Sequence, residues 1–162
     1  MRNNEDRDRY EQYGQSQTIE VYSQIADQWN VDITDFQVPE DPYCSYDITA
    51  SIKGEIRYIE NKTRSDKYHW HYFKDKGYLL ATAKNDGQNT LFNCWWPNDN
   101  IVMITNDRQL EDLTPRKTWV EHIVNCDPDS PSGYVLNYIV PYNRWWVYQI
   151  EPIKLLSKPT KQ

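Results

Sequence analysis

This sequence has few cysteines and no long apolar run. Its three cysteines, Cys44, Cys94 and Cys126, lie far apart and form no Cys-x-x-Cys pair. Scattered thiols of odd number argue against a disulfide framework or a structural zinc site, and they favour a reducing compartment. No apolar stretch reaches the roughly 20 residues of a membrane span, and the N-terminus has no hydrophobic segment typical of a signal peptide. We therefore expect a soluble, cytoplasmic protein that makes no contact with a membrane.

Basic residues are also outnumbered, with 18 Lys and Arg against 24 Asp and Glu and a net charge of −6. This balance argues mildly against indiscriminate binding of nucleic acid. The charge is unevenly distributed, however. Residues 1–50 carry a net −8, residues 51–84 carry eight basic against four acidic side chains, a net +4, and residues 85–162 carry a net −2. The basic excess in residues 51–84 is compatible with an anionic partner, although a solvated surface shows such fluctuations as well.

Aromatic residues are abundant, with 7 Trp, 13 Tyr and 3 Phe among 162 residues. Disordered chains are poor in aromatics, so most of this chain should fold. The length is typical of a single domain. Residues 1–15 are polar and lack periodicity, which predicts a disordered arm. We expect one domain over residues 16–156 and a polar tail over residues 157–162.

The apolar pattern predicts an α/β (α+β) fold, with a central mixed β-sheet flanked by helices. Helical spacing runs from Ser16 to Trp29, and residues 31–42 read as a loop. Residues 43–52 and 55–63 alternate and predict a hairpin with Lys53-Gly54 as a two-residue turn. Further strands are predicted at 77–83, 91–96 and 100–105, and an additional C-terminal β-hairpin at 134–140 and 144–150.

The two-residue turn makes a spatial prediction about charged side chains. If Ile52 pairs with Glu55, then Asp47 lies directly opposite Glu60. Opposite residues have Cβ atoms about 4.5–5.5 Å apart. Lys62 lies two residues beyond Glu60 and shares its face. A single hairpin would therefore gather two carboxylates and one ammonium.

Such a cluster fits metal-dependent phosphodiester chemistry. Two facing carboxylates repel unless a cation lies between them, and Mg²⁺ binds carboxylate oxygens, waters and phosphate oxygens. Lys62 could orient the attacking water and stabilise developing charge. The backbone carbonyl of Asn61 is a further candidate ligand. So is Glu20, near the start of the helix, which we prefer to Asp27 and Asp41.

Arg64, Lys67 and Lys84 are candidate contacts to nucleic-acid phosphates. These basic side chains are most often just solvated charges, which is the alternative interpretation. The catalytic triplet also has an alternative interpretation, because a Glu-x-Lys sequence by itself indicates a surface strand.

Two other groups of residues have alternative interpretations. His69 and His71 could bind a transition metal from one strand face, although no third ligand is evident and packing is the simpler reading. The pairs at 95–96 and 145–146 are tryptophans that could stack on bases. Core packing of one ring from each pair is the favoured interpretation.

Taken in order, these residues resemble the PD-(D/E)XK nuclease superfamily, which has a restriction-endonuclease-like fold. A helix with Glu20, a strand with Asp47, a strand with Glu60-Asn61-Lys62 and the apolar strand 77–84 resemble its αβββαβ core over residues 16–105. The chain departs from the pattern at Tyr46, where a proline is usual. A helix before the fourth strand is also hard to find in residues 85–100.

This resemblance implies a magnesium-dependent nuclease, with Mn²⁺ as a substitute, of a small phage or mobile-element type acting in a bacterial or infected host cell. Asp47 and Glu60 would bind the metal, Lys62 would serve the water and the transition state, and Glu20 would assist. DNA is the expected substrate, while RNA and the choice between endonuclease and exonuclease stay open. Residues 106–162 lie outside the resemblance and could extend the sheet or form a homodimer interface. The alternative is a non-catalytic interaction or regulatory protein on the same scaffold.

Overall fold

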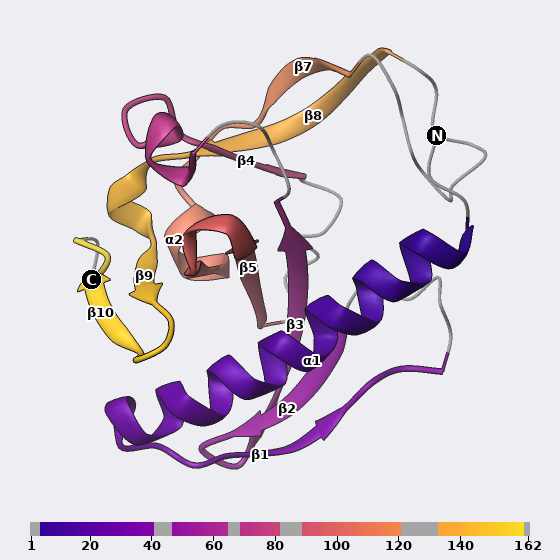
Figure 1. Cartoon of the computed structure of the whole chain (residues 1–162). Coiled ribbons are helices and arrows are strands. Elements are labelled where there is room, and N and C mark those ends of the chain that lie inside the picture. Colours follow the sequence, from indigo (N-terminus) through magenta and orange to yellow (C-terminus); the bar gives the residue numbers. More distant parts are fainter. Residues whose placement is uncertain (1–3, 41–46, 65–68, 82–88, 121–132, 161–162) are drawn as a thin grey trace.

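A long helix and two β-sheets make up the described part of the chain (Figure 1). The computed structural model describes residues 4–40, 47–64, 69–81, 89–120 and 133–160. The helices are α1 (Asn4–Trp29) and the four-residue α2 (Asp107–Leu110). The strands are β1 (Ile33–Gln37), β2 (Ile48–Ile52), β3 (Glu55–Thr63), β4 (Tyr78–Ala81), β5 (Thr90–Trp96), β6 (Ile101–Asn106), β7 (Arg116–Val120), β8 (Gly133–Val140), β9 (Trp146–Gln149) and β10 (Lys154–Ser157).

The larger sheet has seven strands in the order β1-β2-β3-β5-β6-β9-β10. Its neighbouring strands are antiparallel except for β3 and β5, which are parallel. The predicted α+β fold with a central mixed sheet is therefore confirmed. No described helix has the length and apolar character needed to cross a bilayer.

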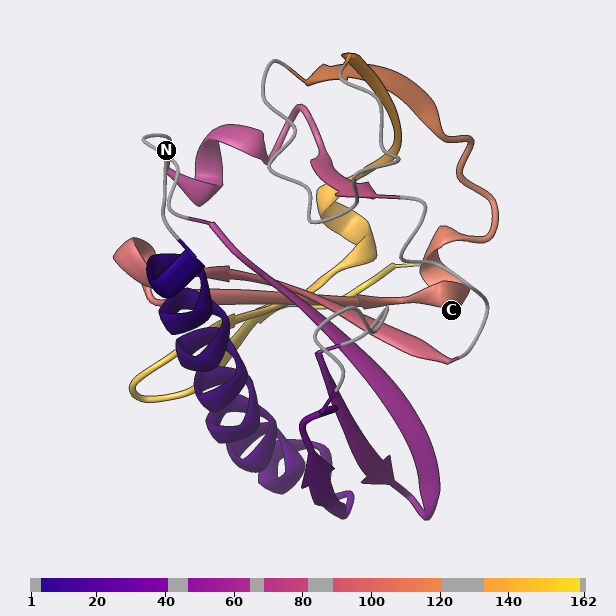
Figure 2. The same ribbon diagram turned by 90° about the vertical axis from the view of Figure 1, so that its right-hand side faces the viewer.

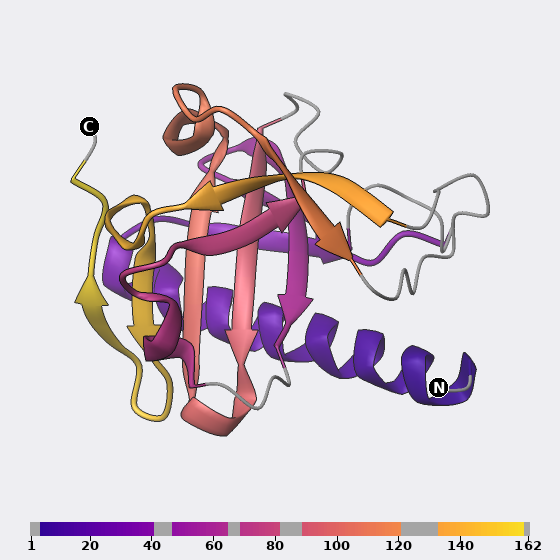
Figure 3. The same ribbon diagram turned by 90° about the horizontal axis from the view of Figure 1, so that it is seen from above.

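The two faces of this sheet are covered differently. Helix α1 packs on one face, and a second sheet of order β4-β8-β7 packs on the other (Figure 2). The strands of the second sheet cross those of the first (Figure 3). The helix-side core includes Val21, Tyr22, Ile25, Ile48, Ile59, Leu91, Ile104 and Tyr148. The inter-sheet core includes Tyr78, Leu80, Phe92, Cys94, Trp96, Met103, Val140 and Trp145.

The β2–β3 hairpin has the predicted two-residue turn. Lys53 and Gly54 have φ angles of 54° and 81°, and such left-handed pairs match the twist of the strands they join. The ladder runs without interruption from Ile52 opposite Glu55 to Ile48 opposite Ile59. The predicted register is therefore confirmed over these pairs.

Two N-terminal predictions are wrong. Helix α1 begins at Asn4 instead of Ser16, so the expected arm 1–15 is largely helical. Its first turns extend past the sheet (Figure 3), where no apolar stripe is required, and Glu, Arg and Gln are good helix formers. Residues 33–37, expected within a loop, form β1 at the sheet edge. Most residues of β1 are exposed, so this segment lacks the alternation of apolar and polar residues that predicts a strand.

The later strands are arranged differently from the predictions. Strand β4, which the resemblance includes in the core of the central sheet, pairs with β8 in the second sheet. Strands β8 and β9 do not form the predicted hairpin, because Trp145 is fully buried in the inter-sheet core and the chain changes sheets there. The C-terminal hairpin of the structure joins β9 to β10.

Candidate functional site

The three residues of the predicted site lie at one end of the β2–β3 hairpin. Ile59 is buried in the helix-side core. Because successive side chains alternate, Glu60 and Lys62 project from the opposite face, toward the second sheet. Their register partners on β5 are Phe92 and Cys94, which belong to the inter-sheet core. Glu60 is half-buried there and Lys62 is exposed.

Asp47 lies against this triplet in a way that the register alone did not predict. The regular ladder stops one pair before Asp47 and Glu60. Instead, the Asp47 amide donates to the Ile59 carbonyl at 2.9 Å. Its carboxylate oxygen Oδ2 accepts a hydrogen bond from the Asn61 amide at 2.7 Å. The Asp47 side chain therefore takes the place of a backbone acceptor and is fixed beside Glu60-Asn61-Lys62.

Asn61 presents its backbone and its side chain to different neighbours. In an antiparallel ladder the N–H and C=O of one residue point to the same side, so the Asn61 carbonyl is directed toward Asp47. Its side chain lies on the helix side, where Nδ2 donates to Thr63 Oγ1 at 3.2 Å. A Cβ built on Gly14 of α1 would come within 2.7 Å of that nitrogen. The helix thus passes very close to the middle of the triplet.

Glu20 is not brought to the other candidates. The positions of α1 that face the sheet include Val21, Tyr22 and Ile25, whereas Glu20 is exposed and accepts a hydrogen bond from Gln24 at 3.2 Å. Helix α1 also covers the face opposite to Glu60 and Lys62. Across the described ranges, no three His, Cys, Asp or Glu side chains form a group that could hold a metal.

The candidate phosphate contacts have unequal outcomes. Arg64 is half-buried, and its Nη2 donates to the Leu79 carbonyl at 2.8 Å while its amide donates to the Trp95 carbonyl at 2.6 Å. Its guanidinium carbon lies 6.0 Å from the Trp96 ring centre. Arg64 therefore ties the two sheets together. Lys67 and Lys84 lie outside the described residues, as does Asp41.

The two histidines have local partners. His69 Nε2 lies 2.9 Å from Asp99 Oδ1, and Asp99 Oδ2 accepts from the Trp70 amide at 3.2 Å. The His71 amide donates to His69 Nδ1 at 3.2 Å. These contacts organise the 3₁₀ turn Trp70–Phe73.

The favoured interpretation, with one ring of each tryptophan pair in the core, is confirmed for residues 145–146 and is wrong for residues 95–96, where both rings are buried. Trp95, Trp96 and Trp145 are at most 5% exposed. Trp146 is half-buried and packs edge to face on Trp29, with ring centres 6.2 Å apart.

A buried polar pair under α1 was missed from the sequence. The Tyr22 hydroxyl donates to Asn93 Oδ1 at 2.7 Å, and Asn93 is 1% exposed in the middle of β5. Burial raises the pKa of Tyr22, so the phenol stays protonated. Asn93 lies beside Asn61 in the parallel register. The sequence feature that could have indicated this pair is Asn93, the single amide side chain inside the apolar run LFNCWW.

Comparison with known proteins identifies no relative: no family model, curated protein or solved structure matches the chain.

Proposed function

We propose that the protein is a metal-dependent nuclease that hydrolyses phosphodiester bonds of DNA. The observation that carries this proposal is the 2.7 Å hydrogen bond from the Asn61 amide to Asp47 Oδ2. It holds one carboxylate against the triplet that supplies a second carboxylate and an ammonium.

The position of these residues in the sheet also supports the proposal. Glu60 and Lys62 lie in the carboxyl-terminal half of β3, and β3 is parallel to β5. Ligands of sheets with parallel strands bind outside the carboxyl ends of those strands. The site therefore lies where a substrate crevice is expected.

The topology is compatible with the PD-(D/E)XK resemblance. Helix α1 precedes three antiparallel strands, β1 to β3, and the fourth neighbour in the sheet is parallel to β3. That neighbour is β5 instead of residues 77–84. Between β3 and β5 the described residues contain a 3₁₀ turn and β4, with no α-helix.

The oxygen donors fit a hard cation such as Mg²⁺ or Mn²⁺. Asp47 and Glu60 would hold it with the Asn61 carbonyl, and Glu20 has no part in this set. When bound, the metal lowers the pKa of a water and polarises the phosphate. Lys62, exposed beside Glu60, would position that water and balance charge on the phosphate.

Cleavage of plasmid and single-stranded DNA with Mg²⁺ or Mn²⁺ tests this function, with single-stranded RNA as a separate substrate. Glu60→Gln and Lys62→Met remove one functional group each. Both should lower the cleavage rate by roughly 100-fold or more. Glu20→Gln removes a carboxylate on the far side of the sheet and should leave the rate unchanged.

Metal binding is measured separately by the shift in melting temperature with added Mn²⁺. Wild type and Lys62→Met should both be stabilised, whereas Glu60→Gln should lose most of that shift. Equal cleavage by all variants would contradict the assignment. Absence of metal-dependent cleavage, together with a stoichiometric protein partner, would support the non-catalytic alternative.

A further inference from the structure

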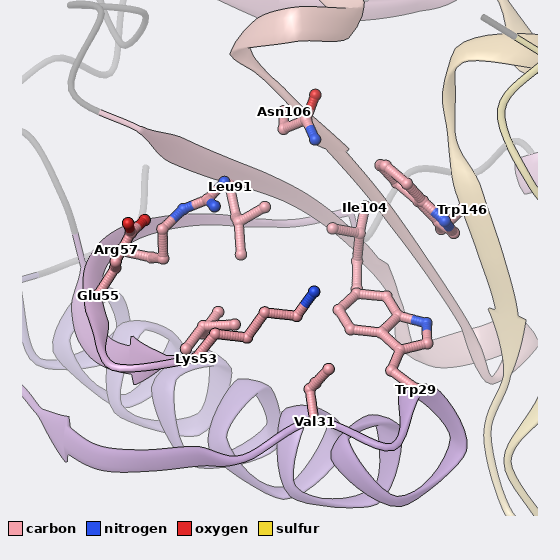
Figure 4. A pocket seen from close by; sticks show the side chains of 10 residues that line it. Trp29, Val31, Lys53, Glu55, Arg57, Leu91, Ile104, Asn106 and Trp146 are labelled. Carbon is pink, nitrogen blue, oxygen red and sulfur yellow. The ribbon is translucent and has the colours of Figure 1, made fainter. Parts of the chain in front are cut away.

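A cavity of about 530 Å³ opens on the helix side of the large sheet (Figure 4). It lies between the end of α1, the β2–β3 turn and strands β5, β6 and β9. Its lining residues Ile52 and Leu91 pack in or against the helix-side core. It is therefore on the face opposite to Glu60 and Lys62, and it is separate from the proposed nuclease site.

Two cations project into this cavity. Lys53 comes from the β2–β3 turn and Arg57 from β3, and Figure 4 shows both side-chain tips directed inward. Arg57 is held in place because its Nε donates to the Asn89 carbonyl at 3.1 Å. Neither side chain forms an ion pair with a described residue. Glu55 also lines the cavity, so the lining carries a net charge of +1 from these three residues.

The remaining walls are mostly apolar. Trp29 and Trp146 present their rings from α1 and β9, and Leu91 and Ile104 form part of the floor. Trp29 is braced by both Trp146 and Tyr148, each with a ring centre 6.2 Å away. Asn106 adds an uncharged polar group. Apolar walls with a few convergent polar groups are typical of small-molecule sites, and the volume is in their usual range.

We propose that this cavity binds a small organic anion with a flat apolar body. The anionic group, a carboxylate or a phosphate, is bound by Lys53 and by the planar fork of Arg57. The apolar body lies against Trp29 and Trp146. The two cations favour a negatively charged ligand, and the rings add binding energy only for a ligand with an apolar body, so free phosphate binds more weakly.

The probe for this site is 2-naphthoate, with the neutral 2-naphthamide and inorganic phosphate as comparisons. Binding is followed by the indole N–H resonances in a proton–nitrogen NMR spectrum. Trp29→Phe and Trp146→Phe assign the two relevant signals, and Trp96 on the other face is the internal reference. Naphthoate should shift the Trp29 and Trp146 signals, bind at least tenfold more tightly than naphthamide, and leave Trp96 unmoved. Inorganic phosphate should bind more weakly than naphthoate.

Charge-removing variants test the role of the cations. Lys53→Asn suits the left-handed turn position, because Asn tolerates that conformation. Lys53→Asn and Arg57→Gln should each weaken naphthoate binding by about tenfold, as expected for loss of a charge-assisted hydrogen bond. Lys117→Asn removes an exposed lysine from β7 and should have no effect. Equal binding of naphthoate and naphthamide would overturn the proposal. So would a loss below threefold in both cavity variants, or an absence of shifts at Trp29 and Trp146.

Discussion

Replacing Gly14 by alanine tests how closely α1 approaches the Glu60-Asn61-Lys62 triplet. Within an ordinary helix, Gly→Ala stabilises by about 1 kcal/mol. Here the new Cβ would lie 2.7 Å from Asn61 Nδ2 and 3.0 Å from Thr63 Oγ1. Overpacking of this kind costs about 1–3 kcal/mol. We therefore expect Gly14→Ala to lower the free energy of unfolding by up to about 2 kcal/mol.

The background variant Asn61→Ala makes the test decisive. Truncating Asn61 removes the 2.7 Å contact and the hydrogen bond to Thr63 Oγ1, so that this oxygen can move away by a change of the Thr63 χ1 rotamer. In that background Gly14→Ala should become stabilising, because the steric cost is gone and only the higher helix propensity of alanine contributes. Urea titration of the four proteins measures the coupling between the two sites. If Gly14→Ala has the same effect with and without the Asn61 amide, the close approach does not determine its cost.

Three further predictions concern stability. Tyr22→Phe leaves the buried Asn93 carbonyl oxygen without its donor and should cost about 1–3 kcal/mol in urea unfolding, with an unchanged midpoint contradicting this. Lys53→Asn should raise the free energy of unfolding by about 0.5–1 kcal/mol, because the turn holds residue 53 at a φ of 54°, and a lowered melting temperature would argue against it. Burial raises the pKa of Tyr22 and Tyr78 above 10 and that of Tyr148 to about 12. Since the unfolded chain then loses these protons first, stability should fall above pH 10 by up to about 1.4 kcal/mol per pH unit for each tyrosine, with a smaller slope in Tyr148→Phe.

The β2–β3 hairpin could be predicted because its signals are local. Strict alternation and Lys53-Gly54 define strand, turn and register within twenty residues of sequence. The position of Asp47 relative to that register could not be predicted. Its side chain replaces a backbone acceptor for Asn61, and this choice depends on atoms that alternation does not describe.

The pairing of strands that lie far apart in the sequence could not be predicted, for a different reason. Strand β5 is buried along its whole length, so its apolar run identifies a strand without saying which neighbour it takes. Strand β4 is as apolar as β5, yet it pairs in the second sheet. Glu20 illustrates the same limit, because helix periodicity shows which face is apolar and not which side of a sheet the helix covers.

The single parallel pairing has a consequence for how this chain folds. The β2–β3 and β5–β6 hairpins join neighbours in the sequence and can form early, since short loops close at little entropic cost. Pairing of β3 with β5 must close a loop that contains β4, and pairing of β6 with β9 spans still more chain. Such long-range contacts slow folding. The hairpin that carries Glu60 and Lys62 should therefore form early. The apolar side chains of β5 should pack beside it only later, when the long-range strand pairing that limits the folding rate takes place.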